Sequence, residues 1–119
     1  MNSHKGADRL RPCPRKPNCV SSGASGRQGI EPIANGTQRW PKLAGVLERI
    51  PEIRVVAHED DYIRGEARTR VLRFVDDIEF QYSPEEDVIH VRSASRLGYS
   101  DFGVNRRRLE TIRKRLEEA

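Results

Sequence analysis

The sequence predicts an α+β fold, in which an irregular, cysteine-containing N-terminal arm precedes a helix, four antiparallel strands and a second helix. Apolar residues recur at helical spacing before Pro51 and again after Ser100. Between these points they alternate with polar residues, as in half-buried strands. The first 36 residues carry few cues for regular structure. We therefore expect an arm over residues 1–36 and a single α+β domain over residues 37–119, with both helices on one face of a four-stranded meander.

The length and composition fit one folded domain. The chain has 119 residues, 35% of them hydrophobic and 34% charged, with a formal net charge of +4. This is a charged surface over a modest core and not a disordered composition. No stretch approaches the roughly 20 apolar residues of a membrane span. The first ten residues lack the apolar region of a signal peptide, so we expect a cytoplasmic protein by default, or a periplasmic or organellar one if a leader was removed.

The first helix is predicted within residues 37–50. Pro41 is tolerated only in a first turn, so the helix should begin near residues 38–40, and Pro51 ends it. Its apolar stripe, at spacings of three and four, consists of Leu43, Val46, Leu47 and Ile50. Ahead of the helix, Ile30 and Ile33 are expected to pin the arm to the domain.

The strands are predicted by alternation and the turn residues between them. They lie near residues 53–57, 62–69, 74–82 and 88–95. In the third strand, one face carries Phe74, Ile78, Phe80 and Tyr82. The S-P-E-E-D segment is expected to turn the chain into the fourth strand. Matching the apolar faces of these two strands pairs Phe80 with Ile89 and Ile78 with Val91. The same register places Asp76 opposite Ser93, and Phe74 opposite Ser95.

The second helix is predicted over residues 102–117. Ser100 or Asp101 is suited to cap its start. Its inward stripe consists of Leu109, Ile112 and Leu116. Residues 104–119 carry six Arg or Lys and three Glu, which invites a nucleic-acid interpretation. Because the Glu residues sit at helical spacing from the basic ones, we expect a solvated face, with Arg107, Arg113 and Lys114 exposed.

A polar site is predicted where the third and fourth strands meet the second helix. The register argument turns Asp76, Ser93 and Ser95 toward the core, and the helical arc of the inward stripe adds Asn105. Arg96 and Tyr99 would form the rim. One interpretation is a satisfied network that locks residues 96–101 to the sheet. The other is a ligand pocket.

The two cysteines, Cys13 and Cys19, are separated by five residues, two of which are prolines. Such a segment is compact, so we expect the pair to lie close enough to bridge. A structural disulfide is favoured, while ordinary thiols and a functional pair stay open. We expect no metal site, because zinc needs four ligands at short spacing and no second Cys or His pair is present.

The histidines do not predict a catalytic triad. His4 lies in the tail, His58 ends a strand, and His90 lies on the strand face opposite Ile89. None has a serine or cysteine partner that spacing suggests, so each is expected to be solvated.

Three motifs carry a family resemblance. They are C-P-x-x-P-N-C-V-S-S at 13–22, F-V-D-D-I-E-F at 74–80 and R-S-A-S-R-x-G-Y-S-D-F-G-V-N-R-x-R at 92–108. From Cys13 to Leu116 the chain resembles the bacterial and plant proteins grouped as domain of unknown function 1499. That resemblance implies no accepted reaction, cofactor or catalytic residue.

Three function classes remain. The favoured one is a small binding or accessory domain, holding a small anion or a protein partner near the R-S-A-S-R segment. Its arginines, at 92, 96 and 106–108, are suited to contact anions. An enzyme using Asp76 or Asp77 as general base is an alternative, although no nucleophile or cofactor motif accompanies them. Nucleic-acid binding through the basic helix is a third, and it lacks interleaved aromatic residues.

Overall fold

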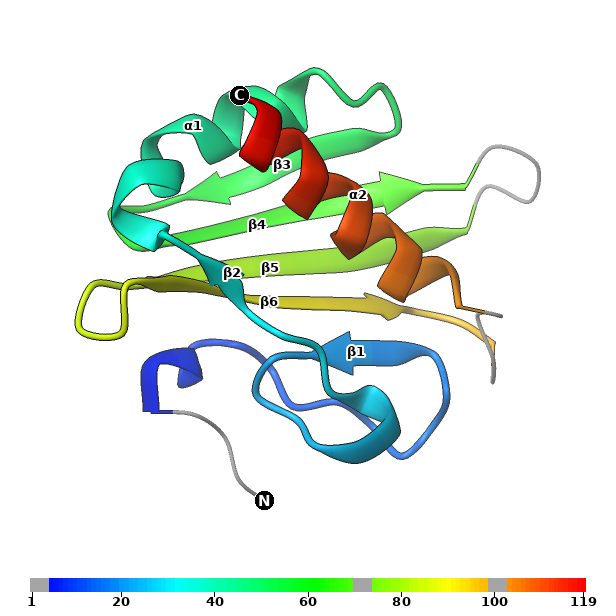
Figure 1. The fold of residues 1–119 in the computed structure, drawn as a ribbon. Coiled ribbons are helices and arrows are strands. Elements are labelled where there is room, and N and C mark those ends of the chain that lie inside the picture. The colour runs from blue at the N-terminus through cyan, green and yellow to red at the C-terminus, as the bar shows by residue number, and fades with distance from the viewer. Residues whose placement is uncertain (1–4, 70–73, 99–102) are drawn as a thin grey trace.

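The computed structural model describes residues 5–69, 74–98 and 103–119. Within these ranges the chain forms two α-helices, six strands and two short 3-10 helices (Figure 1). In chain order they are η1 (Lys5–Ala7), β1 (Cys19–Ser21), η2 (Gly26–Gln28), β2 (Ile33–Ala34), α1 (Gly36–Glu48), β3 (Ile53–His58), β4 (Tyr62–Arg68), β5 (Val75–Ser83), β6 (Val88–Ser95) and α2 (Val104–Glu118). None of the described helices is long and apolar enough to cross a membrane.

The sheet is antiparallel and runs in the order β1-β6-β5-β4-β3, while β2 also pairs with β6. Strands β3 to β6 are the predicted meander. The expectation of four strands is wrong in detail, because the arm adds β1 and β2 along the outer side of β6. These strands have three and two residues, too few to show an alternating pattern. The division of the chain into an arm over residues 1–36 and a single domain over residues 37–119 stays a prediction.

Both helices cover one face of the sheet, as predicted (Figure 1). The apolar core lies between them and that face. The predicted stripes of α1 and α2 are buried in it, from Leu43 and Leu47 to Leu109 and Leu116. Ile33 is also buried there and Ile30 packs against it, so the arm is pinned as expected. Phe74 was predicted on the apolar face of the third strand, but it lies just outside β5 and is 44% exposed.

The register of β5 and β6 is shifted by two residues from the prediction. Phe80 pairs with Val91, Ile78 with Ser93, and Asp76 with Ser95. A shift of two keeps every side chain on its face, so matching apolar faces could not decide between the two registers. The turn decides it. Ser83 pairs with Val88, and the four residues between them are closed by the N–H of Asp87, which donates to the carbonyl of Pro84 at 3.3 Å.

The second face of the sheet is covered as well. The backbone N–H groups of Arg9 and Arg11 donate to the side chains of Gln81 and Glu79, at 2.9 and 3.1 Å. These acceptors alternate with the core residues Ile78 and Phe80, so they point away from the helices. The beginning of the arm therefore crosses the polar face of the sheet. We call this face, with residues 5–13 above it, the arm face.

Candidate functional site

Three of the predicted site residues meet on the helix side of the sheet. The hydroxyl of Ser93 donates to Asn105 Oδ1 at 2.5 Å. Asn105 Nδ2 donates to the hydroxyl of Ser95 at 3.1 Å and to the carbonyl of Asn18 at 3.2 Å. Ser93 and Asn105 are fully buried. One asparagine on the first turn of α2 thus joins the helix to β6 and to the arm.

Asp76 joins this cluster through a residue that the sequence argument did not place there. Its carboxylate lies 2.8 Å from Arg108 Nη1. The same nitrogen donates to Asn105 Oδ1 at 3.0 Å and to Ser93 Oγ at 3.3 Å. The sequence contained one signal for this contact: Arg108 lies three residues after Asn105, and residues at that spacing are neighbours on a helix. These mutual contacts support the structural interpretation of the cluster, a network that joins α2 to β5 and β6.

Arg96 does not form the rim of that cluster. Residues 92, 94 and 96 alternate with Ser93 and Ser95, so Arg96 emerges on the arm face. Its Nε and Nη2 donate to the two carboxylate oxygens of Asp77 at 2.9 and 2.8 Å, and Nη2 also reaches Glu66 at 2.8 Å. The predicted group of arginines is therefore divided between the two faces of the sheet. Tyr99, the other predicted rim residue, lies outside the described residues.

The candidate general bases are both held by arginines. The hydrogen bonds from Arg96 lower the pKa of Asp77 below its usual value. A carboxylate stabilised in its charged form is a weak base, which argues against the enzymatic alternative at this residue. Asp76 is 2% exposed and is engaged by Arg108.

Glu79 is the centre of the arm face. It is fully buried, and its Oε2 accepts from Arg92 Nη1 at 3.0 Å and from Arg11 Nε at 2.9 Å. Its Oε1 accepts from the hydroxyl of Tyr62 at 3.1 Å. Burial, with the charge of Glu79 beside it, raises the pKa of Tyr62 to about 12. Two arginines therefore share one buried carboxylate.

Arg92 retains an unused hydrogen-bond donor. Its side chain is 7% exposed. Nη1 donates to Glu79, and Nη2 donates to the carbonyl of Pro12 at 3.1 Å, but Nε has no hydrogen-bond partner among the described residues. Burial lowers the pKa of Arg92, and the neighbouring Arg11 acts in the same direction. A buried donor without a partner costs about 1–3 kcal/mol, so an acceptor placed at Nε would stabilise this side chain.

A cleft of about 480 Å³ opens between the arm and the segment 21–28. Arg92 does not line it, but Arg92 contacts Pro12 and is paired across the strands with Ser21, and both of these residues do. One wall is the arm, including Leu10, Pro12 and Cys13, and the other is the segment 21–28, including Ser21 and Ser25. Ser21 is the cross-strand partner of Arg92, so the two side chains are neighbours on the same face. Since Pro12 accepts a hydrogen bond from Arg92, both walls flank that guanidinium.

Among the described residues, the positive surplus of the arm face is local. One connected set of ion pairs contains five arginines, Arg11, Arg64, Arg68, Arg92 and Arg96, and three carboxylates, Glu66, Asp77 and Glu79. Asp8 at the cleft wall and the pairs of Arg9 with Glu59 and Asp61 offset that difference. The surplus of one positive charge is therefore at Glu79, where two arginines share one carboxylate.

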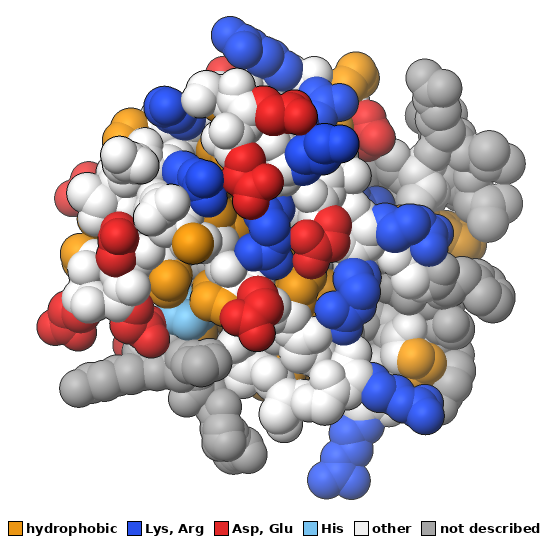
Figure 2. Space-filling model, in the orientation of Figure 1, with side chains coloured by type: hydrophobic (Ala, Val, Ile, Leu, Met, Phe, Trp, Pro, Cys, Tyr) orange, Lys and Arg blue, Asp and Glu red, His pale blue; other side chains and the backbone are white. Residues whose placement is uncertain are grey.

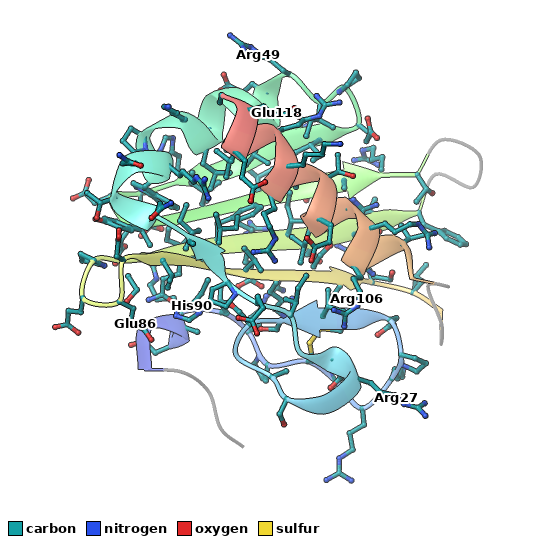
Figure 3. All side chains as sticks on the ribbon, in the orientation of Figure 1. Arg27, Arg49, Glu86, His90, Arg106 and Glu118 are labelled. Atoms are coloured by element: carbon teal, nitrogen blue, oxygen red, sulfur yellow. A yellow bond between two sulfur atoms is a disulfide. The ribbon has the colours of Figure 1, made fainter. Side chains whose placement is uncertain are left out.

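His90 is buried, contrary to the expectation of a solvated histidine. Its Nδ1 lies 3.0 Å from the hydroxyl of Ser22, and its Nε2 lies 2.7 Å from Glu86 Oε1. The side chains of Glu86 and His90 lie together beside the start of the arm (Figure 3). The arm covers this face of the sheet, which the sequence pattern could not show. Ser22 Oγ also accepts from the N–H of Val91 at 2.9 Å, so these contacts tie the end of β1 to β6. Within the described ranges, no group of three or more His, Cys, Asp or Glu side chains is placed to hold a metal ion.

The basic helix α2 uses part of its charge within the protein. Arg106 donates to the carbonyls of Arg27 and Gly29, and Arg113 donates to those of Glu31 and Pro32. Arg113 is therefore half-buried, which corrects the expectation that it is exposed. Arg107 and Lys114 are exposed, as expected. On the face seen in Figure 2, acidic side chains stand between the basic ones instead of leaving a continuous basic stripe.

Cys13 and Cys19 form a disulfide, with their Cα atoms 5.7 Å apart. The expectation that the pair lies close enough to bridge is confirmed. Cys19 is in β1, and Cys13 follows the residues that cross the arm face. The bond therefore fastens the arm wall of the cleft to the sheet.

The comparisons place the chain in a family. A family model described as protein of unknown function (DUF1499) matches residues 9–116. The chain therefore belongs to this family, as its three motifs indicated. No curated protein and no solved structure matches it.

Proposed function

We propose that this member of the DUF1499 family is a binding domain for a small organic monoanion, held in the cleft between the arm and the segment 21–28. The observation that carries the proposal is Arg92, whose buried Nε lacks a hydrogen-bond partner within the part of the chain that the structure describes. A carboxylate oxygen is the acceptor that an arginine donor favours most. The proposal thus keeps the anion predicted near the R-S-A-S-R segment and places it on the arm face.

The charge of the site favours a ligand that carries one negative charge. Arg11 and Arg92 share the single buried carboxylate of Glu79, which leaves one surplus positive charge at this point of the network. A monocarboxylate balances that surplus, whereas a dianion exceeds it. In a site shielded from water, such a match counts for more than on an open surface.

The cleft favours an organic body on the anion. Its volume of about 480 Å³ is in the range of small-molecule sites. Apolar side chains line part of it, those of Ala7, Leu10, Pro12 and Ala24. A flat or short hydrocarbon group would contact these side chains while its carboxylate faces Arg92.

Benzoate is a suitable probe, with benzamide as its neutral control of nearly the same shape. Titration calorimetry of the full chain should show benzoate binding and markedly weaker benzamide binding. Binding should also weaken as salt rises, because part of the attraction is electrostatic. Equal binding of the two compounds, or no binding of benzoate, contradicts the proposal.

A matched pair of variants at Ser25 localises the site. Ser25 is exposed on the cleft wall and its side chain makes no capping hydrogen bond, so substitution should leave the fold intact. Ser25→Glu puts a competing negative charge at the cleft and should weaken benzoate binding at least tenfold. Ser25→Gln has nearly the same size and should bind within about twofold of the wild type. If both variants bind like the wild type, the anion is held elsewhere.

A further inference from the structure

The arm wall of the cleft is held by a small number of contacts. Besides the disulfide, the N–H groups of Arg9 and Arg11 donate to Gln81 and Glu79, and Pro12 accepts from Arg92. The side chain of Arg11 also donates to Glu79, and Gln81 donates to Asp8. The guanidinium of Arg9 adds exposed ion pairs with Glu59 and Asp61 and lies 4.2 Å from the ring centre of Tyr62. Exposed pairs of this kind are individually weak.

The beginning of the arm, residues 5–13, is separate from the main apolar core. Its buried residues Ala7 and Leu10 form a second cluster with Tyr62, while the main cluster begins at Val20. The face beneath the arm is polar and contains Glu79, Gln81 and Arg92. Water would solvate these side chains if the arm left, so the core beneath the helices does not depend on this cover.

The two cysteines of the disulfide differ in exposure. Cys13 is half-buried and lines the cleft, whereas Cys19 is 3% exposed. We propose that the Cys13–Cys19 bond is a redox-operated latch on the cleft, opened by a dithiol that attacks at Cys13. This inference rests on the proposed function, because it names the regulation of that same ligand site.

The exchange proceeds in two balanced steps. A thiolate of the dithiol attacks the Cys13 sulfur, forming a mixed disulfide and releasing the Cys19 thiolate, which takes up a proton. The second thiol of the reagent then attacks the reagent sulfur that is bonded to Cys13 and releases Cys13 as a thiol. The protein disulfide gains two electrons and two protons, and the dithiol becomes a cyclic disulfide.

The size of the effect follows from the length of the ring. The two cysteines have a sequence separation of 6. In the chain-entropy account, opening such a short ring changes the ratio of closed to open forms by up to about fiftyfold. Because the arm forms one wall of the cleft, benzoate affinity should fall in proportion to the closed fraction that reduction removes, and by no more than that factor.

Hydrogen exchange tests the latch without any ligand. The amides of Arg9 and Arg11 should exchange faster in dithiothreitol, and equally fast in the Cys13→Ser/Cys19→Ser variant without it. The amide of Gly36, which donates to the carbonyl of Asp87 at 2.9 Å on the helix side, is the internal control and should not change. Unchanged exchange at Arg9 and Arg11, or equal acceleration at Gly36, overturns the latch.

Benzoate titration of the oxidised and reduced protein then separates the two proposals. Weaker binding after reduction supports the latch as regulator of the site. If the oxidised protein does not bind benzoate, the proposed function fails and exchange alone judges whether the arm is released. If the arm is released but benzoate affinity is unchanged, the arm is not a wall of the ligand site and the regulatory inference is wrong.

Discussion

Replacing Asp76 by alanine tests whether the helix-side cluster is a structural network. Asp76 is 2% exposed, and the side chain of its partner Arg108, 2.8 Å away, is 11% exposed. Removing one member of a buried ion pair typically costs about 3–5 kcal/mol, because the remaining charge stays buried. Arg108 keeps two neutral acceptors, Asn105 and Ser93, so we expect the lower end, about 3 kcal/mol.

Urea denaturation measures this loss, and thermal unfolding should show a fall in Tm of about 10–15 °C for a domain of this size. The double variant Asp76→Ala/Arg108→Met removes both charges. Its loss of stability should be about 2 kcal/mol smaller than the summed losses of the two single variants. Glu110, an exposed carboxylate 2.9 Å from the half-buried Arg113, is the control, and because Arg113 keeps its carbonyl acceptors, Glu110→Ala should cost less than about 0.5 kcal/mol. If Asp76→Ala costs no more than this control, the structural interpretation is refuted.

Three further predictions follow from local features. The pKa of Tyr62 is raised to about 12 by burial, so its contribution to stability is complete below pH 10 and should be lost as the pH rises through 12. An ultraviolet titration that finds every tyrosine ionising near pH 10 contradicts this. The pKa of Asp77 is lowered by Arg96, so its contribution to stability is present above the ordinary aspartate pKa of 3.8 and should disappear as the pH falls through the pKa of the folded state. The carboxyl carbon chemical shift of Asp77, followed against pH, should have a higher titration midpoint in Arg96→Gln than in the wild type. Equal midpoints refute the assignment of the shift to Arg96. Finally, Gly36→Ala puts a Cβ 2.6 Å from the backbone of Val88 and should cost about 2–3 kcal/mol in urea denaturation, whereas Gly45→Ala, with open space around it, should not destabilise the fold.

Periodicity alone predicted the two helices and the four long strands. The stripes from Leu43 to Ile50 and from Leu109 to Leu116 are buried as expected, because a repeat of 3.6 over several turns has few alternatives. The register of β5 and β6 was not predictable in the same way. Both registers bury the same face, and the choice between them depends on hydrogen bonds in the turn before Val88.

The candidate site was only partly predictable. Asp76, Ser93, Ser95 and Asn105 lie on the helix side, because alternation fixes which face each strand residue occupies. The arm face was missed. A strand face with Asp77, Glu79 and Gln81 has the pattern of a solvated surface, and nothing in the sequence indicates that an irregular segment covers it. For the same reason the burial of His90 and the unpaired Nε of Arg92 could be recognised only in three dimensions.

The most direct test of the account is the resonance of the Arg92 Nε–H group in a nitrogen–proton correlation spectrum. This proton is buried and has no acceptor within residues 5–69, 74–98 and 103–119, so its signal should be resolved, and Arg92→Lys assigns it by its absence. On addition of benzoate to the oxidised protein, we predict a downfield shift of this proton that saturates with the calorimetric binding curve. Benzamide should leave it nearly unchanged. If benzoate binds while the Arg92 signal stays in place, or if no signal moves at all, the cleft beside Arg92 is not an anion site.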